Sequence, residues 1–382
     1  CPRSYLLDEI TDVVDAQGLT TREAYFAAPR PGRGTPLGKG PKTLVWRVRE
    51  LFYEALAARG LTTWSLLRVR AAERVVSGAV KPRYDGVVID EAQDLPPTAR
   101  RMLAGLSRTP AGVFLTADAN QSIYGGQFRW VDVHASLKFQ GRTGVLKANH
   151  RSTRELALAA AQYLAADETA VLDAEGEASH VNRGPVPAVR TVAGFDDEAD
   201  LLAGFFRHAA RELRLGLGGC AVLVPFRQSQ TRIAEALTAR GLEAVVVDGD
   251  KLDLAAPGVK LVTLKSAKGL EFPIVAVAGF LDGDYPVLAP GLTPADEAMT
   301  LGEERRSLYV AMTRAMHALL VLVPEGAQTP LLRGFDPQLW NVGQEAPAPR
   351  ASGTRPSVRP APGIAKTRGR DADRGKRRGS GG

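Results

Sequence analysis

The sequence of 382 residues predicts an α/β fold: two parallel-sheet units, a helical N-terminal segment and a disordered basic tail. Three observations support this. Short aliphatic runs alternate with helix-like stretches between residues 81 and 335, as in sheets covered by helices on both faces. Residues 1–80 are mainly helical in pattern. Residues 346–382 are rich in Pro, Gly, Ala and Arg, a composition typical of disorder.

The N-terminal half contains one clear helix and two buried strands. Leu44 to Arg59 is the clearest amphipathic stretch of residues 1–80 and follows a Pro/Gly-rich loop. In the first unit, residues 81–150, we expect strands at Gly86 to Ile89 and Gly112 to Thr116. A helix from about Thr98 connects them, as parallel strands require.

The second unit, residues 151–335, begins with a capping box at Ser152-Thr153-Arg154-Glu155, ahead of an Ala/Leu-rich helix to about Ala166. The expected elements that follow are helix Asp197 to Arg214, strand Cys220 to Val224, helix Thr231 to Arg240, strands Ala244 to Val247, Val259 to Leu264 and Ile274 to Ala278, helix Glu303 to Ala315 and strand Leu319 to Val323.

The formal net charge of +7 resides in the tail. From Ala346 onward the chain has ten Lys or Arg and two acids, Asp371 and Asp373. The tail therefore carries a net charge of +8, which leaves the rest of the chain at −1. The tail is expected either to bind phosphate backbones in a salt-dependent way or simply to aid solubility.

Cysteine content and hydropathy exclude several classes of protein. Cys1 and Cys220 are the only cysteines, which argues against a disulfide scaffold or a multi-cysteine metal site and favours the cytoplasm. Cys220 opens an aliphatic run and is expected in the core. No apolar run approaches the ~20 residues of a membrane span, so no membrane association is expected.

The stretch VVIDEAQDL places acids directly after a buried strand. Ligands bind at the carboxyl edge of parallel sheets, where Asp90 can hold a hydrated Mg²⁺ and Glu91 can orient or deprotonate a water. An exposed acidic turn is the plainer alternative. A third acid, Asp94, has no expected role beyond capping the following helix. Gln121, in ADANQSIY after the second strand, is expected at the same edge, within reach of a γ-phosphate and the attacking water.

Three further stretches complete a recognisable order: LKANHRS, TLKSAKGLEF and EERRSLYVAMTRA. With DEAQD and ADANQSIY, they resemble motifs II to VI of the UvrD/Rep/PcrA-like superfamily 1 DNA helicases, over about Tyr84 to Val323. The resemblance implies two RecA-like domains, the first incomplete. Residues 1–80 would be a helical 1B-like segment, residues 81–150 the C-terminal part of domain 1A, and residues 151–335 a domain 2A without a large 2B insertion.

The resemblance also implies an ATP site with residues from both domains. Asp90 would hold Mg²⁺, Glu91 would be the general base, and Gln121 would couple the γ-phosphate to the DNA site. Arg151 and Arg314 would act as arginine fingers, stabilising the charge of phosphoryl transfer. A surface salt bridge is the alternative for each arginine, although Arg314 lies in a largely apolar run and therefore needs a partner.

The remaining site residues follow from the same resemblance. Glu271 would contact the nucleotide sugar, Gly269 would allow close backbone approach, and His150 would stack on the adenine where the family has Tyr. The DNA contacts would come from Tyr124, Phe128, Arg129, Trp130, Thr263 and Lys265. Base stacking on such aromatic residues contributes ~1 to 3 kcal/mol per base. Lys265 replaces the family's His and would contact phosphate. The segment after Tyr124 is longer than usual, which leaves open which aromatic residue stacks.

A phosphate-binding loop of the form G-x-x-x-x-G-K-[ST] is not recognisable. The nearest stretch, Gly34 to Thr43, has the wrong Gly spacing, no preceding strand and Pro41 where helix N–H donors are wanted. We therefore expect motif I to lie upstream, and this chain alone to hydrolyse ATP poorly or not at all.

Three functions are compatible with the sequence. The leading one is a portion of an ATP-dependent DNA helicase that moves 3′ to 5′ on single-stranded DNA. A non-catalytic pseudo-helicase, binding DNA or a protein partner, is the second. A helicase fused to a nuclease is the third, although no cluster of acids and Lys after motif VI indicates a metal-dependent nuclease.

Overall fold

The computed structural model describes residues 3–30, 33, 36–117, 144, 146, 148–165, 179–247, 255–288 and 290–343. The basic tail and the residues from Asp118 to Thr143 lie outside these ranges. Within them, no helix is long and apolar enough to cross a membrane.

The N-terminal segment is helical, as predicted. It contains α1 (Arg3–Asp8), the π-helical turn η1 (Glu9–Asp15), α2 (Arg22–Ala27), α3 (Lys39–Ala57) and α4 (Trp64–Val76). Hydrophobic side chains from η1, α2 and α3 form its small core, namely Ile10, Val13, Val14, Tyr25, Val45 and Trp46.

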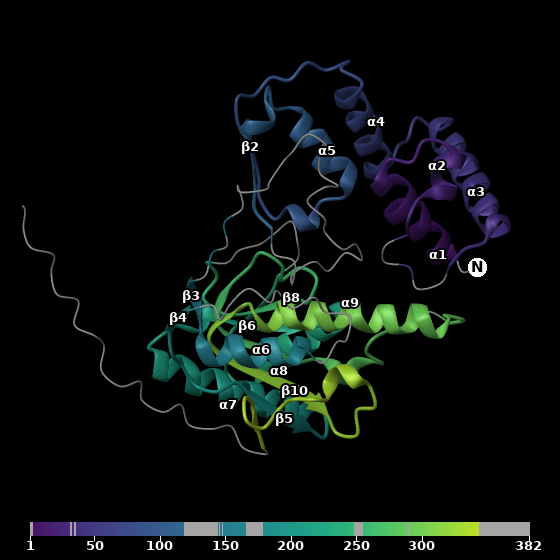
Figure 1. Cartoon of the computed structure of the whole chain (residues 1–382). Coiled ribbons are helices and arrows are strands. Elements are labelled where there is room, and N and C mark those ends of the chain that lie inside the picture. The colour runs from purple at the N-terminus through teal and green to yellow at the C-terminus, as the bar shows by residue number, and fades with distance from the viewer. Residues whose placement is uncertain are drawn as a thin grey trace, which may run out of the picture. The chain divides into compact units, whose positions relative to one another are not determined.

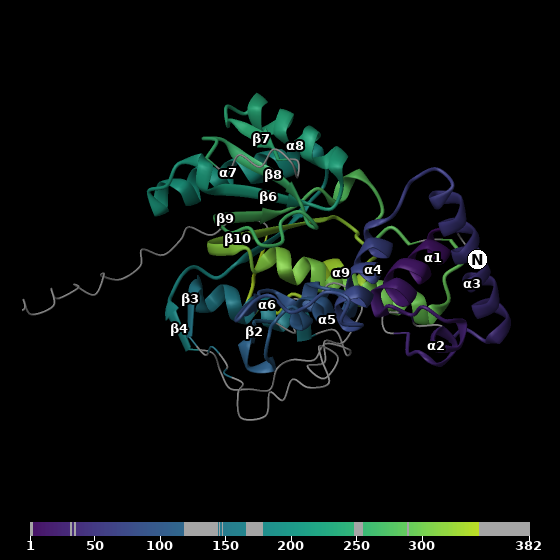
Figure 2. The same cartoon turned by 90° about the horizontal axis from the view of Figure 1, so that it is seen from above.

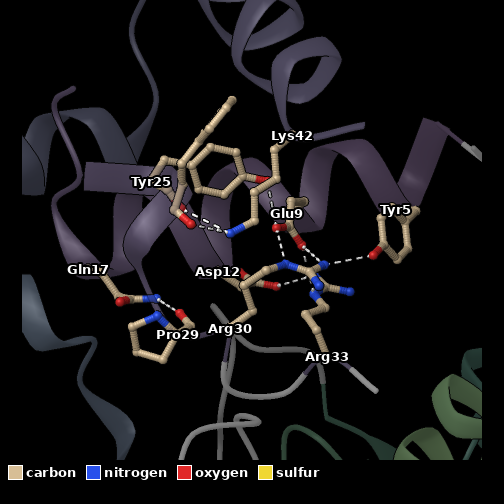
Figure 3. Close-up of polar contacts among 10 residues, drawn as sticks. Tyr5, Glu9, Asp12, Gln17, Tyr25, Pro29, Arg30, Arg33 and Lys42 are labelled. Carbon is tan, nitrogen blue, oxygen red and sulfur yellow. Dashed lines mark hydrogen bonds and ion pairs between the residues drawn. The ribbon is translucent and has the colours of Figure 1, made fainter. Parts of the chain in front are cut away.

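A buried carboxylate organises this helical segment (Figure 3). Glu9 is fully buried and accepts hydrogen bonds from Arg30 Nε at 2.6 Å and from the Tyr25 hydroxyl at 2.8 Å. The Arg30 guanidinium also donates to the Tyr5 hydroxyl at 2.8 Å. Because a buried charge needs a charged, hydrogen-bonded partner, these contacts hold the chain after α2 against η1. Burial is the main reason that the pKa of Tyr25 lies well above its ordinary value.

The first α/β unit contains the two predicted strands. β1 (Val87–Ile89) and β2 (Val113–Leu115) pair in parallel, with Val88 opposite Phe114. Two short 3-10 turns, η2 (Ala92–Asp94) and η3 (Pro110–Gly112), flank α5 (Pro97–Gly105), which makes the connection between the strands.

The second α/β unit is built on a seven-stranded parallel sheet of order β11-β5-β10-β9-β6-β8-β7 (Figure 1). The strands of this sheet are β5 (Ala188–Val192), β6 (Cys220–Val224), β7 (Ala244–Val246), β8 (Val259–Thr263), β9 (Phe272–Val277), β10 (Ala315–Pro324) and β11 (Asn341–Val342). A separate parallel pair, β3 (Ala148–Thr153) and β4 (Ser179–Asn182), carries the last five residues of the LKANHRS stretch in β3.

Helices cover both faces of the large sheet (Figure 2). On one face, α6 (Arg154–Ala165) and α9 (Pro294–Met312) pack through side chains such as Tyr163 and Leu308. On the other, α7 (Phe195–Leu213) and α8 (Arg227–Ala239) pack through side chains such as Phe206 and Leu237. This double coverage explains why the strands are almost continuously apolar.

Most predicted elements of this unit are present, but several differ from the prediction, and β4 was not predicted. β5 was not predicted, because Arg190 interrupts its apolar run; the buried guanidinium is held by the carbonyl of Asn341 on β11 at 2.7 Å. α9 begins nine residues before Glu303, at Pro294, where Thr293 caps it. The predicted capping box is wrong, because Glu155 accepts from the Gly184 N–H at 2.9 Å.

Cys220 is a core residue, as expected. Its side chain is fully buried at the start of β6. Burial raises the pKa of this thiol to about 12, so the reactive thiolate is not formed near neutral pH.

Candidate nucleotide site

The acidic pair Asp90 and Glu91 follows β1 directly and is exposed at the carboxyl end of the strand, as predicted. Glu91 adopts a left-handed backbone conformation with φ of 49°, which is uncommon for a residue other than glycine. Such backbone strain persists where neighbouring contacts impose it, often at functional sites. Its N–H donates to Asp90 Oδ1 at 3.1 Å and to the Thr116 hydroxyl at 3.2 Å.

Two side chains that were not predicted hold these carboxylates. The Thr116 hydroxyl, at the end of β2, donates to Asp90 Oδ1. The amide of Gln93, whose side chain is buried, donates to Glu91 Oε2. Thr116 carries no motif signal of its own, but its position one residue after a strand that pairs with β1 places it beside Asp90. Neighbouring side chains therefore orient both carboxylates.

Asp94 does not cap the following helix, so that expectation is wrong. The N-cap position of α5 is Pro96, which makes no side-chain capping bond. Asp94 Oδ1 instead accepts a hydrogen bond from Lys268 of the SAKGLEF stretch.

The LKANHRS stretch forms a local irregularity in the pairing of β3 with β4, between Asn149 and Thr153. The Asn149 side-chain oxygen accepts from the backbone N–H of Arg151 at 2.9 Å and of Ser152 at 3.1 Å. This Asx turn fixes the backbone of Arg151. The sequence did not predict this role for Asn149, although Asn is a residue that commonly forms such turns with the backbone two residues later. His150 is exposed and its carbonyl accepts from Asn182 at 2.9 Å.

The SAKGLEF stretch follows β8 as a turn that Thr263 stabilises. The Thr263 hydroxyl donates to Ser266 Oγ at 2.9 Å and accepts from the Ser266 N–H at 3.3 Å. Lys265 is exposed. Gly269 has φ of +79° with open space around it, so the glycine is required here by its backbone conformation.

Glu271 and Arg151 lie together. Arg151 Nη2 is 2.6 Å from Glu271 Oε1, and the two side chains are 48% and 33% exposed. The residue predicted to contact the γ-phosphate, Arg151, therefore lies beside the residue predicted to contact the sugar, Glu271, although 119 residues lie between them in the sequence.

Arg314 is almost completely buried, at 3% exposure, as its apolar surroundings in the sequence suggested. It follows α9, and its guanidinium donates to the carbonyl of Val310 at 3.0 Å, to the hydroxyl of Thr313 at 3.3 Å and to the carbonyl of Leu270 at 3.5 Å. The Arg314 side chain is therefore buried rather than exposed at the surface, and these three contacts are to oxygens of its own unit.

The residues present fit a hydrated Mg²⁺ held with phosphate oxygens. The described residues contain no group of three or more His, Cys, Asp or Glu side chains suited to a metal ion. A magnesium ion at an ATP site normally takes only one or two carboxylates, its other ligands being waters and phosphates. Asp90 is exposed and oriented by Thr116, which suits that single-carboxylate role.

Five predicted site residues lie outside the described part of the chain: Gln121, Tyr124, Phe128, Arg129 and Trp130. Their roles stay predictions.

The Gly-rich stretch before Thr43 has a structural use. It leads into α3, and the preceding element is the helix α2. Lys42 is buried, and its ammonium donates to the carbonyls of Phe26 at 2.8 Å and Tyr25 at 3.3 Å. Lys42 therefore anchors α3 on α2.

Comparisons with known proteins point to one family. Residues 49–143 match the family model of the UvrD/REP helicase N-terminal domain, and residues 250–325 match that of the UvrD-like helicase C-terminal domain. The two matches occur in the order of the motifs identified above and contain the residues around Asp90 and Arg314.

Curated relatives carry concordant names. "Probable DNA helicase" of Mycoplasma pneumoniae is 28% identical over 62% of this chain and 43% of its own length. "ATP-dependent DNA helicase UvrD1" of Mycobacterium tuberculosis is 36% identical over 30% of this chain and 15% of its own length. "DNA helicase II" of Escherichia coli is 46% identical over 18% of this chain and 9% of its own length. The chain thus spans less than half the length of these relatives.

A solved structure, the C-terminal domain of a possible DNA helicase from Lactobacillus plantarum, aligns with a TM-score of 0.37 and 23% identity, over 52% of this chain and 99% of that one.

Proposed function

Because this chain belongs to the UvrD/Rep/PcrA-like helicase family by its two matched domains, we propose that it forms part of an ATP-dependent motor that moves 3′ to 5′ along single-stranded DNA. The observation that supports this most is the clustering at the SAKGLEF turn, where Glu271 pairs with Arg151 and Leu270 accepts from Arg314. Residues far apart in the sequence are brought to one place, as a shared ligand requires. Such a motor would work in the cytoplasm, where DNA and ATP are available.

The proposed chemistry is phosphoryl transfer to water. Asp90 would hold the Mg²⁺ that neutralises the phosphates, and Glu91 would accept a proton from the attacking water. Gln121 would position that water, and Arg151 and Arg314 would stabilise the charge that spreads over the γ-phosphate.

Nucleotide and DNA would bind to neighbouring residues. His150 would stack on the adenine, Glu271 would bind the ribose hydroxyls, and Gly269 would keep the SAKGLEF turn in its required conformation. The DNA strand would contact Tyr124, Phe128, Arg129, Trp130, Thr263 and Lys265. Opening and closing of the two α/β units around ATP would then move the strand.

The proposed function predicts DNA-stimulated ATP hydrolysis and directional movement. In the longest natural product of the gene that encodes this chain, we expect ATPase activity that rises on addition of single-stranded DNA, and displacement of a strand annealed beside a 3′ single-stranded tail. Measurement uses phosphate release and a fluorescent strand-displacement assay, with a 5′-tailed duplex as the control. DNA binding without any ATP hydrolysis would instead support the pseudo-helicase.

The tail provides a further prediction about DNA affinity. Removal of residues 346–382, which carry ten basic side chains, is expected to weaken binding of a fluorescent oligonucleotide. It should also make the plot of log K against log salt concentration less steep. The slope is expected to change by about 0.7 for each phosphate that the tail neutralises in the intact chain. A second variant, with the ten basic residues replaced by Gln, keeps the length of the tail and removes only its positive charge. An unchanged slope in both variants would leave the tail with a solubilising role only.

A further inference from the structure

The ion pair between Arg151 and Glu271 joins the two predicted nucleotide contacts. We infer that Glu271 is a positioning residue that retains Arg151 at the SAKGLEF turn, so that only a nucleotide with a γ-phosphate draws the guanidinium away. This inference rests on the proposed function and adds a second role for Glu271 beside its predicted sugar contact.

The backbone around Arg151 is constrained, so the change is confined to its side chain. The Asn149 side chain binds the N–H of Arg151 at 2.9 Å, which holds the backbone of the LKANHRS stretch. On the opposite side, Glu271 belongs to a turn whose conformation Gly269 permits with φ of +79°. The contact between them, 2.6 Å from Nη2 to Oε1, therefore joins two well-defined backbones through two side chains.

The same turn also retains the second arginine. The carbonyl of Leu270, next to Glu271, accepts from Arg314 Nη1 at 3.5 Å. Both cations predicted to meet the γ-phosphate are thus bound to adjacent residues of one turn. A ligand that takes up either cation must exchange a contact with this turn for a contact with phosphate.

The strength of the pair suits a reversible exchange. Both side chains are partly exposed, and an ion pair of this kind changes an equilibrium by about two- to fivefold. A terminal phosphate carries more charge than a carboxylate and accepts from arginine at two positions, so it can displace Glu271. ADP has no terminal group at that position, and its binding leaves the pair intact.

The test compares two ligands in the longest natural product of the gene. The measured quantity is the ratio of the Kd for ADP to the Kd for a non-hydrolysable ATP analogue, obtained by calorimetry at low salt. Loss of the sugar contact in Glu271→Gln raises the Kd of both ligands by the same factor, so this effect cancels in the ratio. Release of Arg151 favours the triphosphate alone, so the ratio is expected to rise by about two- to fivefold.

Two controls isolate the pair. In an Arg151→Ala background, Glu271→Gln should leave the ratio unchanged, because there is no guanidinium to release. Glu155→Gln alters a comparable pair in the same unit, 3.3 Å from Arg183, and should also leave the ratio unchanged.

The outcomes separate this inference from the proposed function. A ratio that does not rise in Glu271→Gln, or that rises equally without Arg151, overturns the inference while nucleotide binding stands. If the unsubstituted protein binds neither nucleotide, the proposed function fails and the inference fails with it.

Discussion

Glu91→Gln is expected to lower DNA-stimulated ATP hydrolysis by at least about a hundredfold, the contribution typical of a general base. Gln is nearly the same size as Glu but cannot accept the proton of the attacking water. The affinities for nucleotide and single-stranded DNA should change little, because Asp90 keeps its contact with Thr116. Phosphate release and oligonucleotide binding, measured on the longest natural product of the gene, check the two halves of this expectation.

A matched control is Glu54→Gln, an exposed position on α3 far along the chain from the acidic pair. It makes the same chemical change and should leave hydrolysis unaltered. Retention of full turnover by Glu91→Gln would remove Glu91 from the mechanism. Loss of DNA binding together with hydrolysis would indicate a folding defect around β1.

Arg232→Ala is expected to lower the free energy of unfolding by about 3 kcal/mol, near the lower limit for breaking a buried ion pair because Arg232 keeps some exposure. Its guanidinium bridges Glu198 on α7, at 2.7 Å, and Asp282 after β9, at 2.7 to 2.8 Å. Glu198 is 1% exposed, so removal of Arg232 leaves a buried charge without its cation. Chemical denaturation of the chain, followed by circular dichroism, measures the loss.

Glu198→Gln provides the decisive second variant. The Gln side-chain oxygen can still accept from the Gly279 N–H, which Glu198 binds at 2.8 Å, but it carries no charge. In the Arg232→Ala background this substitution should therefore restore part of the lost stability. If it instead adds a further full loss, the cost of Arg232→Ala does not come from an uncompensated charge.

The same network predicts a pH dependence. Burial alone would raise the pKa of Asp282, but hydrogen bonds from Arg232 and Ser229 outweigh it and the pKa lies below its ordinary value of 3.8. A depressed carboxyl pKa contributes stability that is present above the unfolded pKa and is lost as pH falls through the folded one. Stability should therefore decline below about pH 4, and Arg232→Ala should reduce that decline.

Local pattern was enough to predict most of the strands. β6 begins at Cys220 and ends at Val224 as expected, because a fully buried parallel strand is a continuous aliphatic run. β5 could not be predicted in this way. Its central Arg190 is stabilised by Asn341, 151 residues later, and no local pattern reports such a partner.

The order of the motifs and the residue types of the candidate nucleotide site follow from the sequence alone: two acids after one strand, and arginines in two later stretches. Which of these groups meet depends on the tertiary structure. Thr116 reaches Asp90 because β2 pairs with β1, and Arg151 reaches Glu271 because an Asx turn at Asn149 and a glycine turn at Gly269 bring their backbones together. Side-chain partners depend on strand register and loop conformation, which are set by packing across the whole domain. They therefore cannot be predicted from the short stretches around Asp90 and Arg151.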